Sequence, residues 1–412
     1  MPESPQLHVI IVGAGLAGLT AALILAPHHR VTVYERGGPD VATGGQGIIV
    51  APNGVKILQG IGFEPARAGA VPIRGIRTYG RDGVLLEDVD MDLKQRFGAD
   101  SWAIKRGDFR GVLGQMVAEA AKGEGMVEIV YGSGVVGVEC DRGVVELEGG
   151  EKVKGDVVIV ADGVHSRLRN TILKSNEYKA KKTGLTCYRI AVSTEDASVA
   201  LGDLPPPHWW DPSNSQNNSA LIFADDGSPR FITAYPIRNA EMFNLSCILR
   251  TDESTKTTAE SWHADGDRNE MIETFSDFGE QVKRILSAAT EVKVWELQDL
   301  EPLPTWTSGR VMLIGDAAHA MSPLQGQGAN MSIEDAESLR LLTPDTRPED
   351  VLELLKLAES VRRPRTAQVL AQTRASHSKF ATVGERLTAN LDFNCGYDGI
   401  HDALARQKAA AK

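Results

Sequence analysis

The segment that most constrains this chain is its opening stretch, LHVIIVGAGLAGLTAALILAPHHRVTVYER, at residues 7–36. Three apolar runs are separated by a glycine-rich turn and a polar break, and this order predicts a strand, a helix and a second, parallel strand. The stretch is apolar over about the length of a membrane span. Glycines interrupt it where a strand would turn into a helix, so we predict a buried strand and helix, without a signal peptide or a membrane anchor.

The glycine spacing of the turn indicates a nucleotide site. In a G-x-G-x-x-G turn, one glycine permits the tight turn, one lets the backbone approach a pyrophosphate, and one lets the helix pack on the strand. Gly13, Gly15 and Gly18 have this spacing, and Glu35 follows Gly15 at the offset where an acid reaches a ribose 2′-hydroxyl. The segment therefore predicts a dinucleotide-binding unit, and the alternative is a buried βαβ unit without a ligand.

A second match to the same spacing, Gly132, Gly134 and Gly137, has a different context. With 41 glycines in 412 residues, such a match occurs about 0.4 times by chance. The residues that follow alternate between apolar and polar through successive turns up to the buried run DVVIVAD, which predicts a β-meander. Because no helix N-terminus follows these glycines, we expect no second phosphate site here.

Composition excludes several classes of partner and site. The net charge is −11, and we interpret the dense basic runs KAKK (179–182) and VRRPRT (361–366) as solvated surface, so no nucleic-acid partner is expected. Four cysteines lie far apart without a C-x-x-C pair, and no H-E-x-x-H occurs. We therefore expect free thiols, no metal site and a cytoplasmic location. The hydrophobic and charged fractions are those of an ordinary globular protein, so no membrane association is expected.

Three motifs that occur in order define a resemblance to a known family. They are GAGLAG with Glu35, ADGVHSRLR at 161–169, and GDAAHAMSPLQGQGANMSIEDA at 315–336. The set resembles the para-hydroxybenzoate hydroxylase family of single-component FAD-dependent monooxygenases, and more closely its salicylate-hydroxylase-like and fungal tailoring branch. The resemblance covers about the first 375 residues.

The resemblance implies an α/β fold with two interleaved domains. A Rossmann-like FAD-binding domain, with a glutathione-reductase-like βαβ unit, would alternate along the chain with a mostly β substrate-binding domain, and C-terminal helices would follow. The expected bounds are 1–72, 100–180 and 300–345 for the FAD-binding domain, 73–99 and 181–299 for the substrate-binding domain, and 346–412 for the C-terminal helical region. We expect a monomer or a homodimer.

The resemblance also implies which residues contact FAD. Arg106, in IKRGDFRGVL, would contact the ribose or the pyrophosphate, and a backbone group near Val135 would bond the adenine. Asp316 can accept a hydrogen bond from a ribitol hydroxyl, and residues 326–330 open a helix whose free amides suit the negative charge of reduced flavin. The full expected set is Gly13, Gly15, Leu16, Ala17, Gly18, Glu35, Arg36, Gly47, Arg106, Val135, Asp162, Asp316, Gly326, Gly328, Ala329 and Asn330.

Asp162 and Arg169 belong to the second motif. A carboxylate in the position of Asp162, after a buried strand, caps the exposed amides of a helical turn. The resemblance adds a role near FAD and near the visiting nicotinamide nucleotide. Arg169 offers a guanidinium fork that suits a phosphate.

Arg189 in CYRIAV and Tyr235 in TAYPIRN are the expected catalytic residues, because they match positions where related fungal enzymes direct side chains at the substrate. For Arg189 a sheet ion pair, and for Tyr235 an ordinary cross-strand aromatic contact, stay open as alternatives. Trp209 and Trp210 would form either a pocket lid or, more simply, domain packing.

The function implied by the resemblance is that of an FAD-dependent monooxygenase. It would use NAD(P)H and O2 to hydroxylate or epoxidise an aromatic or polycyclic small molecule through a flavin C4a-hydroperoxide. NAD(P)H would bind only transiently, without a Rossmann fold of its own. The alternatives are an FAD-dependent reductase or oxidase on the same scaffold without oxygen insertion, and a catalytically silent flavoprotein.

Overall fold

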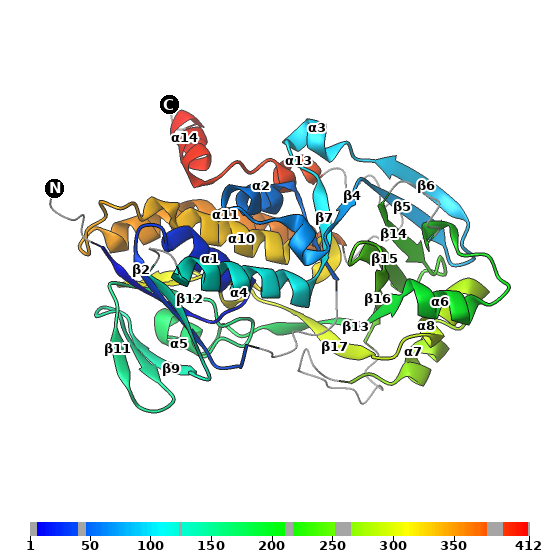
Figure 1. Cartoon of the computed structure of the whole chain (residues 1–412), viewed down its shortest axis with the longest axis horizontal. Helices are drawn as coiled ribbons and strands as arrows, with labels where there is room; N and C mark the ends of the chain where they lie inside the picture. The colour runs from blue at the N-terminus through cyan, green and yellow to red at the C-terminus, as the bar shows by residue number, and fades with distance from the viewer. Residues whose placement is uncertain are drawn as a thin grey trace.

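Two large β-sheets, each covered by its own helices, lie side by side along the long axis of the molecule (Figure 1). The computed structural model describes residues 6–39, 47–122, 126–210, 217–251, 265–376 and 390–410. The expected α/β class, with a mainly parallel sheet, a largely antiparallel sheet and C-terminal helices, is confirmed.

The first sheet contains the opening βαβ unit. Its strands, in spatial order, are β18 (Thr307–Ser308), β19 (Val311–Leu313), β12 (Val157–Val160), β1 (His8–Val12), β2 (Arg30–Glu35) and β8 (Val127–Tyr131). Neighbours pair in parallel, except that β18 is antiparallel to β19. The central strands are almost fully buried because helices cover the sheet, which explains their continuous apolar runs.

Helix α1 (Leu16–Leu25) packs between α4 (Arg106–Lys122) and α10 (Gly328–Ser338). Nine of its ten residues are buried, so α1 is apolar on all sides and belongs to the core. The predicted strand, helix and strand are therefore confirmed, and the residues of the opening stretch form interior elements of the first sheet.

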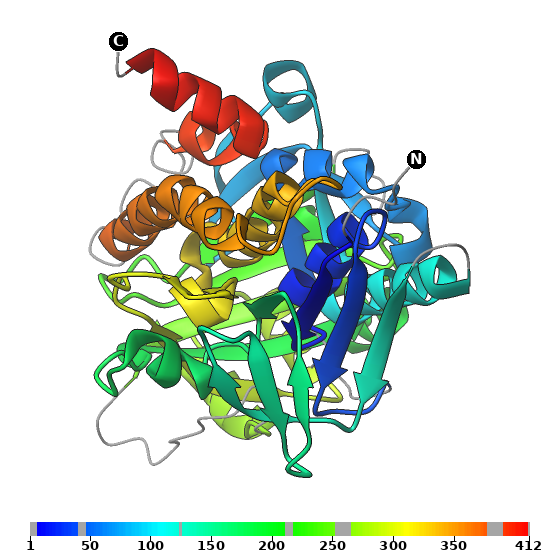
Figure 2. The ribbon, with the colours of Figure 1, turned by 90° about the vertical axis from the view of Figure 1, so that its left-hand side faces the viewer.

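The region after the second glycine match is the predicted β-meander. It consists of β9 (Val135–Glu139), β10 (Val144–Leu147) and β11 (Lys152–Lys154), all antiparallel, and it leads into β12. Figure 2 shows these strands next to the first sheet. The short helix α5 (Leu168–Leu173) follows β12.

The second sheet is antiparallel except where β14 pairs in parallel with β5. In spatial order it contains β17 (Lys293–Asp299), β13 (Lys181–Ser193), β16 (Met242–Arg250), β15 (Phe231–Ile237), β14 (Asn218–Phe223), β5 (Gly75–Gly80) and β6 (Leu85–Asp90). One face packs under α6 (Thr194–Leu201), α7 (Arg268–Thr274) and α8 (Glu280–Ser287).

Side chains of the second sheet alternate between its two faces. In β15, Ile232 and Ala234 join the core under the helices, whereas Phe231, Thr233 and Tyr235 face a cavity. Trp209 and Trp210 are buried in the core on the helix side, where Trp210 stacks on Phe243 with ring centroids 4.0 Å apart. The packing role expected for the tryptophan pair is therefore confirmed.

A small sheet lies between these two parts, and the C-terminal helices lie beside the first part and the small sheet (Figure 1). The small sheet is β3 (Gly47–Val50), β7 (Ser101–Lys105) and β4 (Val71–Ile73), with α2 (Pro52–Gly60), η1 (Pro65–Ala68) and α3 (Leu93–Phe97) nearby in the chain. The later elements are α9 (Asp316–His319), η3 (Pro323–Gln325), η4 (Leu339–Leu341), α11 (Val351–Ser376), α13 (Leu391–Cys395) and α14 (Ile400–Ala410).

Sheet membership supports the division into domains, which we keep as a proposal. Every strand of the first sheet lies in the ranges expected for the FAD-binding domain, and every strand of the second sheet lies in the ranges expected for the substrate-binding domain. Among the described helices, none combines the length and the apolar character that crossing a membrane requires.

Candidate active site

A cavity of about 400 Å³ lies between the two large sheets. One side is formed by the glycine turn before α1, by Asp316 and by the start of α10. The opposite side, called here the sheet wall, contains Arg189, Leu221, Phe223, Phe231, Tyr235 and Ile248, together with the smaller side chains of Ser219, Thr233 and Ser246. Of the expected site residues, those that border the cavity are Gly15, Leu16, Ala17, Gly47, Arg106, Arg189, Tyr235, Asp316, Gly326, Gly328 and Ala329.

The glycine turn needs its three glycines for three different reasons. Gly13 has φ +102°, and a Cβ there would lie 2.6 Å from the Ala161 carbonyl oxygen. A Cβ at Gly18 would lie 2.0 Å from the carbonyl oxygen of Gly13, so α1 packs directly on the turn. A Cβ at Gly15 would meet no protein atom within 4 Å, which leaves the space beside it open to the cavity. No side chain caps the start of α1, so its amides remain available to an anion.

Glu35 is held at the end of β2, outside the cavity. Its carboxylate accepts hydrogen bonds of 2.8 Å from the backbone amides of Ala14 and Gly37. Its backbone carbonyl accepts from the amide of Ser133, so the residues before Val135 lie beside the same strand end. Arg36 is exposed.

Arg106 and Asp316 border the cavity, each as the first residue of its helix. Arg106 is the first residue of α4; burial lowers the pKa of its guanidinium, and the nearby Asp316 carboxylate acts in the opposite direction. The sequence interpretation missed Arg110, one turn further along α4, whose Nε donates to the Ala14 carbonyl at 2.9 Å. In the sequence, Arg110 is the second arginine of RGDFR and could have been noticed there. In the structure, its contact with Ala14 holds the glycine turn in place.

The residues at the start of α10 border the cavity with their backbone, and the buried side chain of Asn330 holds them in place. Gly326, Gly328 and Ala329 border the cavity, while the Asn330 side chain is completely buried. The Oδ1 atom of Asn330 accepts from the Ala51 amide at 2.9 Å, and its Nδ2 donates to the Gly326 carbonyl at 2.9 Å. Asn330 therefore shapes the loop and does not border the cavity itself.

Arg169, in the second motif (161–169), holds two loops together instead of facing the cavity. Arg169 is 2 % exposed, and its guanidinium donates to the carbonyls of Ala317 at 2.7 Å and Val164 at 2.9 Å. The prediction that this fork is available to a phosphate is wrong, because backbone carbonyls on two loops already use it. Asp162 is half-buried, and desolvation by its surroundings raises the pKa of its carboxyl.

Arg189 and Tyr235 come together on the sheet wall. The Arg189 guanidinium lies 3.3 Å from the centroid of the Trp295 ring, a cation–π contact that orients it. Burial lowers the pKa of Arg189 to about 10, which still leaves a cation at neutral pH, and burial raises the pKa of Tyr235. Gly47 lies so close that a Cβ there would be 2.6 Å from the Tyr235 ring and 2.8 Å from the Asn244 Cβ.

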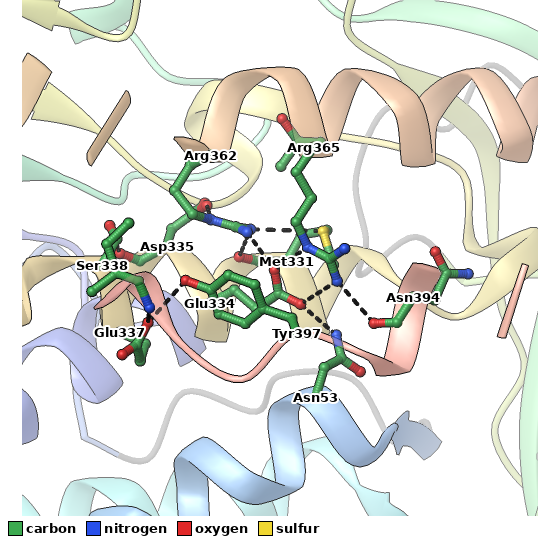
Figure 3. A network of polar contacts seen from close by, with 12 residues as sticks. Asn53, Met331, Glu334, Asp335, Glu337, Ser338, Arg362, Arg365, Asn394 and Tyr397 are labelled. Atoms are coloured by element: carbon green, nitrogen blue, oxygen red, sulfur yellow. Dashed lines mark hydrogen bonds and ion pairs between the residues drawn. The ribbon is translucent and has the colours of Figure 1, made fainter. Parts of the chain in front are cut away.

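A buried charged network stands behind the start of α10 (Figure 3). Glu334 and Asp335 are completely buried, and Arg362 of α11 forms ion pairs with both carboxylates. Arg365 also pairs with Glu334, at 2.7 Å, and Asn53 of α2 donates to the same carboxylate at 2.6 Å. The interpretation of VRRPRT as solvated surface is therefore wrong for Arg362 and Arg365, which hold α10 in place.

The network extends to the loop that carries Asp316. The Oδ2 atom of Asp335 accepts from the Gly315 amide at 2.9 Å and lies 2.5 Å from the Nε2 atom of His319. His319 is buried against the Trp306 ring, with centroids 5.2 Å apart. His319 is thus a packed side chain that helps to set the position of Asp316.

Comparisons with known proteins define the class. The chain matches the family model for an FAD binding domain over residues 6–373. It is 31% identical over 376 residues to the FAD-dependent monooxygenase ntnJ of Nectria sp, covering 89% of this chain and 83% of that protein. It is 30% identical over 426 residues to 6-hydroxynicotinate 3-monooxygenase of Pseudomonas fluorescens, covering 100% of both chains.

Solved structures have the same fold. The structure of CtdE in complex with FAD and a substrate has a TM-score of 0.82 at 23% identity and covers 98% of this chain and 99% of its own. A salicylate hydroxylase substrate complex has a TM-score of 0.77 at 24% identity and covers 97% of each chain. The chain belongs to the FAD-binding family of class A flavin monooxygenases and is a flavoprotein monooxygenase, so the resemblance is confirmed.

The residues of the cavity fit FAD, the cofactor of this family. The open space beside Gly15 and the uncapped start of α1 suit a pyrophosphate, and the start of α10 suits an electron-rich ring system. Arg106 and Asp316 supply one cation and one hydrogen-bond acceptor between these two ends.

Removing FAD is expected to lower the melting temperature, and returning it should restore the original value. A ligand that binds only the native state adds about 2.7 kcal/mol at 100 times its Kd. Riboflavin is the matched control, because it lacks the pyrophosphate and adenosine that the glycine turn would bind. Thermal melts of the apoprotein measure both effects, and an equal increase with riboflavin would contradict the role given to the glycine turn.

Proposed function

We propose that this chain hydroxylates or epoxidises an aromatic or polycyclic small molecule, with bound FAD and with NAD(P)H and O2 as co-substrates. The cavity carries the proposal, because one side is built from nucleotide-binding motifs and the other from apolar side chains with one arginine, one tyrosine and three smaller hydroxyl side chains. By their names, two relatives act on 6-hydroxynicotinate and 3-hydroxybenzoate. Hydroxylated single-ring aromatics are therefore the first candidate substrates.

The cofactor and the chain would divide the chemistry. Bound FAD would supply electron transfer and the activation of oxygen. The amides at the start of α10, at Gly328 and Ala329, would stabilise negative charge in the cavity by about 0.3 to 2 kcal/mol. Arg106 would add a second positive group on the same side of the cavity.

The sheet wall would hold the substrate and exclude water. Leu221, Phe231 and Ile248 form an apolar surface against which an aromatic ring packs. Arg189, oriented by Trp295, would neutralise a phenolate oxygen or a carboxylate. Tyr235 stays protonated because burial raises its pKa, so it would donate a hydrogen bond to the substrate.

Arg189→Met is expected to lower substrate-stimulated NAD(P)H consumption about 100-fold, because it removes the buried cation that faces the substrate. FAD content should not change, since Arg189 lies on the sheet wall. Arg250→Met is the matched control, because Arg250 is exposed at the end of β16. Steady-state kinetics with both variants measures the effect, and wild-type turnover in Arg189→Met would remove this residue from the site.

A panel of aromatic compounds tests the proposed function. Purified holoenzyme is mixed with NADH or NADPH and with hydroxybenzoates, hydroxynicotinates, aminohydroxybenzoates or indoles, one at a time. The proposal predicts that at least one compound accelerates NAD(P)H consumption and is converted to an oxygenated product. Acceleration without any change in the aromatic compound, across the panel, would contradict it.

A further inference from the structure

The C-terminal helix α13 forms part of the cavity. Leu391, Asn394 and Cys395, called here the α13 wall, border the cavity that the glycine turn and the sheet wall also border. The sequence interpretation assigned residues 346–412 to a separate helical region and placed no site residue there. A helix close to the C-terminus therefore contributes directly to the space that would receive a ligand.

A charged clamp holds the α13 wall from behind (Figure 3). Arg365 of α11 donates to the backbone carbonyls of Phe393 at 2.7 Å and Asn394 at 2.8 Å. The same guanidinium is fixed by two hydrogen bonds to the buried Glu334 carboxylate, of 2.7 and 2.8 Å. Because Glu334 lies on α10, Arg365 connects the helix that starts at the cavity to the helix that borders it.

Two further contacts connect the α13 wall to residues that lie next to the sheet wall or follow the second sheet in the chain. The Asn394 side chain donates to Gln325 of η3 at 3.2 Å. Leu324, the residue before Gln325, packs against the apolar cluster of the sheet wall. On the outside, Asp392 pairs with Arg96 of α3 at 3.0 Å, and α3 directly follows the second sheet in the chain. By contrast, the groups that fit FAD lie at the glycine turn, at Asp316 and at the start of α10.

Two of the three residues of the α13 wall, Leu391 and Cys395, suit an apolar group. Leu391 is a half-buried aliphatic side chain, and Cys395 is buried. Burial raises the pKa of the Cys395 thiol to about 12, so it stays neutral and behaves as a small apolar group. Across the cavity, Arg189 and Tyr235 supply the polar contacts, so a substrate with one polar end and one apolar end matches both sides.

We propose that Leu391 and Cys395 are specificity-determining residues that limit how far an apolar substituent of the aromatic substrate extends, and that Arg365 is the positioning residue that holds them there. This inference rests on the proposed function for the identity of the ligand as an aromatic compound. The inference concerns the affinity for the substrate, so its test measures the binding of substrate-like probes.

The test uses holoenzyme and a graded series of 4-alkylphenols as probes, with Kd measured from the change in the flavin absorbance spectrum. Leu391→Ala is expected to shift the preference toward longer alkyl chains by about tenfold relative to the wild type, and Leu391→Trp toward shorter chains. Leu357→Ala is the matched control, since Leu357 lies exposed on α11. If Leu391→Ala binds no chain length that the wild type excludes, including the case of no binding, the inference is wrong.

Arg365 is tested in the same assay. Arg365→Met is expected to weaken the binding of every probe about tenfold, with the FAD content unchanged because Arg362 still pairs with Glu334 and holds α10. Arg365→Lys is expected to recover part of the loss, because a charged donor group remains. Arg406→Met, in an exposed pair on α14, is the control. Equal loss of binding in Arg365→Met and Arg365→Lys, or loss of FAD in both, would show a purely structural role. Because no turnover is needed, these outcomes are distinct from a failure of oxygenation.

Discussion

Gly18→Val is expected to yield a protein that does not retain FAD. A Cβ at this position would lie 2.0 Å from the Gly13 carbonyl oxygen, and that oxygen is backbone, so it cannot rotate away. Either α1 moves off β1 or the turn opens, and both changes displace the amides that would face the pyrophosphate. We expect FAD affinity to fall at least about 100-fold, which is roughly 2.7 kcal/mol.

Absorbance of the purified protein and FAD titration of the apoprotein measure this loss. Gly111→Ala is the matched control, because Gly111 is exposed within α4 and a Cβ there meets no atom within 4 Å. That variant should keep FAD and gain up to about 1 kcal/mol in the free energy of unfolding. Normal FAD affinity in Gly18→Val would refute the close helix–turn contact on which the cofactor site depends.

Arg362→Met is expected to lower the free energy of unfolding by about 3 to 5 kcal/mol. Arg362 is completely buried between Glu334 and Asp335, and its loss leaves Asp335 buried without this partner. Burial disfavours the charged form of both carboxyls, but the cationic side chains around them outweigh this effect, so both pKa values lie below their ordinary values. These are Arg362 and Arg365 beside Glu334, and His319 and Arg362 beside Asp335.

Because the pKa values of Glu334 and Asp335 are lowered in the native state, the stability that the network contributes depends on pH. Unfolding raises these pKa values to the ordinary ones, so the unfolded state binds more protons in acid, and the stability contribution is lost as the pH falls below about 4. Denaturant unfolding at several pH values measures both effects. Arg347→Met, in an exposed pair with Asp350, is the control and should change stability by less than about 0.5 kcal/mol. A similar change in Arg347→Met and Arg362→Met would contradict the importance of the buried network.

The parts of the fold that could be predicted from sequence are those encoded by neighbouring residues. The turn at Gly13 to Gly18, the β-meander after Gly137 and the glycine-rich start of α10 each depend on spacing within about twenty residues. Hydrophobic periodicity and turn residues are local features of the sequence, so these elements can be predicted from a single chain.

The errors concern residues whose partners are distant in sequence. Arg362 lies 28 residues from Glu334, and Arg169 lies 148 residues from the Ala317 carbonyl that it bonds. The sequence of a basic run is the same whether its side chains contact water or a buried carboxylate. We therefore assigned VRRPRT to the solvated surface, which is the more common case. The α13 wall was missed for the same reason, because only the folded chain brings Cys395 to the cavity.

In and around the sheet wall, some contacts could be predicted from the sequence and others could not. Gly47 and Tyr235 were both expected in the site, and the structure brings them into contact. Asn244, whose Oδ1 accepts from the Gly47 amide at 2.7 Å, was not expected, because its position depends on the register between β15 and β16. Register between strands follows from which face is buried, and one sequence does not supply it for each pair.

Oxygen labelling tests whether this chain inserts an oxygen atom from O2 into its substrate. Holoenzyme is supplied with NAD(P)H, the aromatic compound that best stimulates its consumption, and ¹⁸O-labelled O2 in ordinary water, and the product is analysed by mass spectrometry. For a monooxygenase, we expect a product that carries one labelled oxygen atom. A product without the label, or a dehydrogenated or reduced product, would contradict monooxygenation and would indicate an oxidase or reductase on the same scaffold.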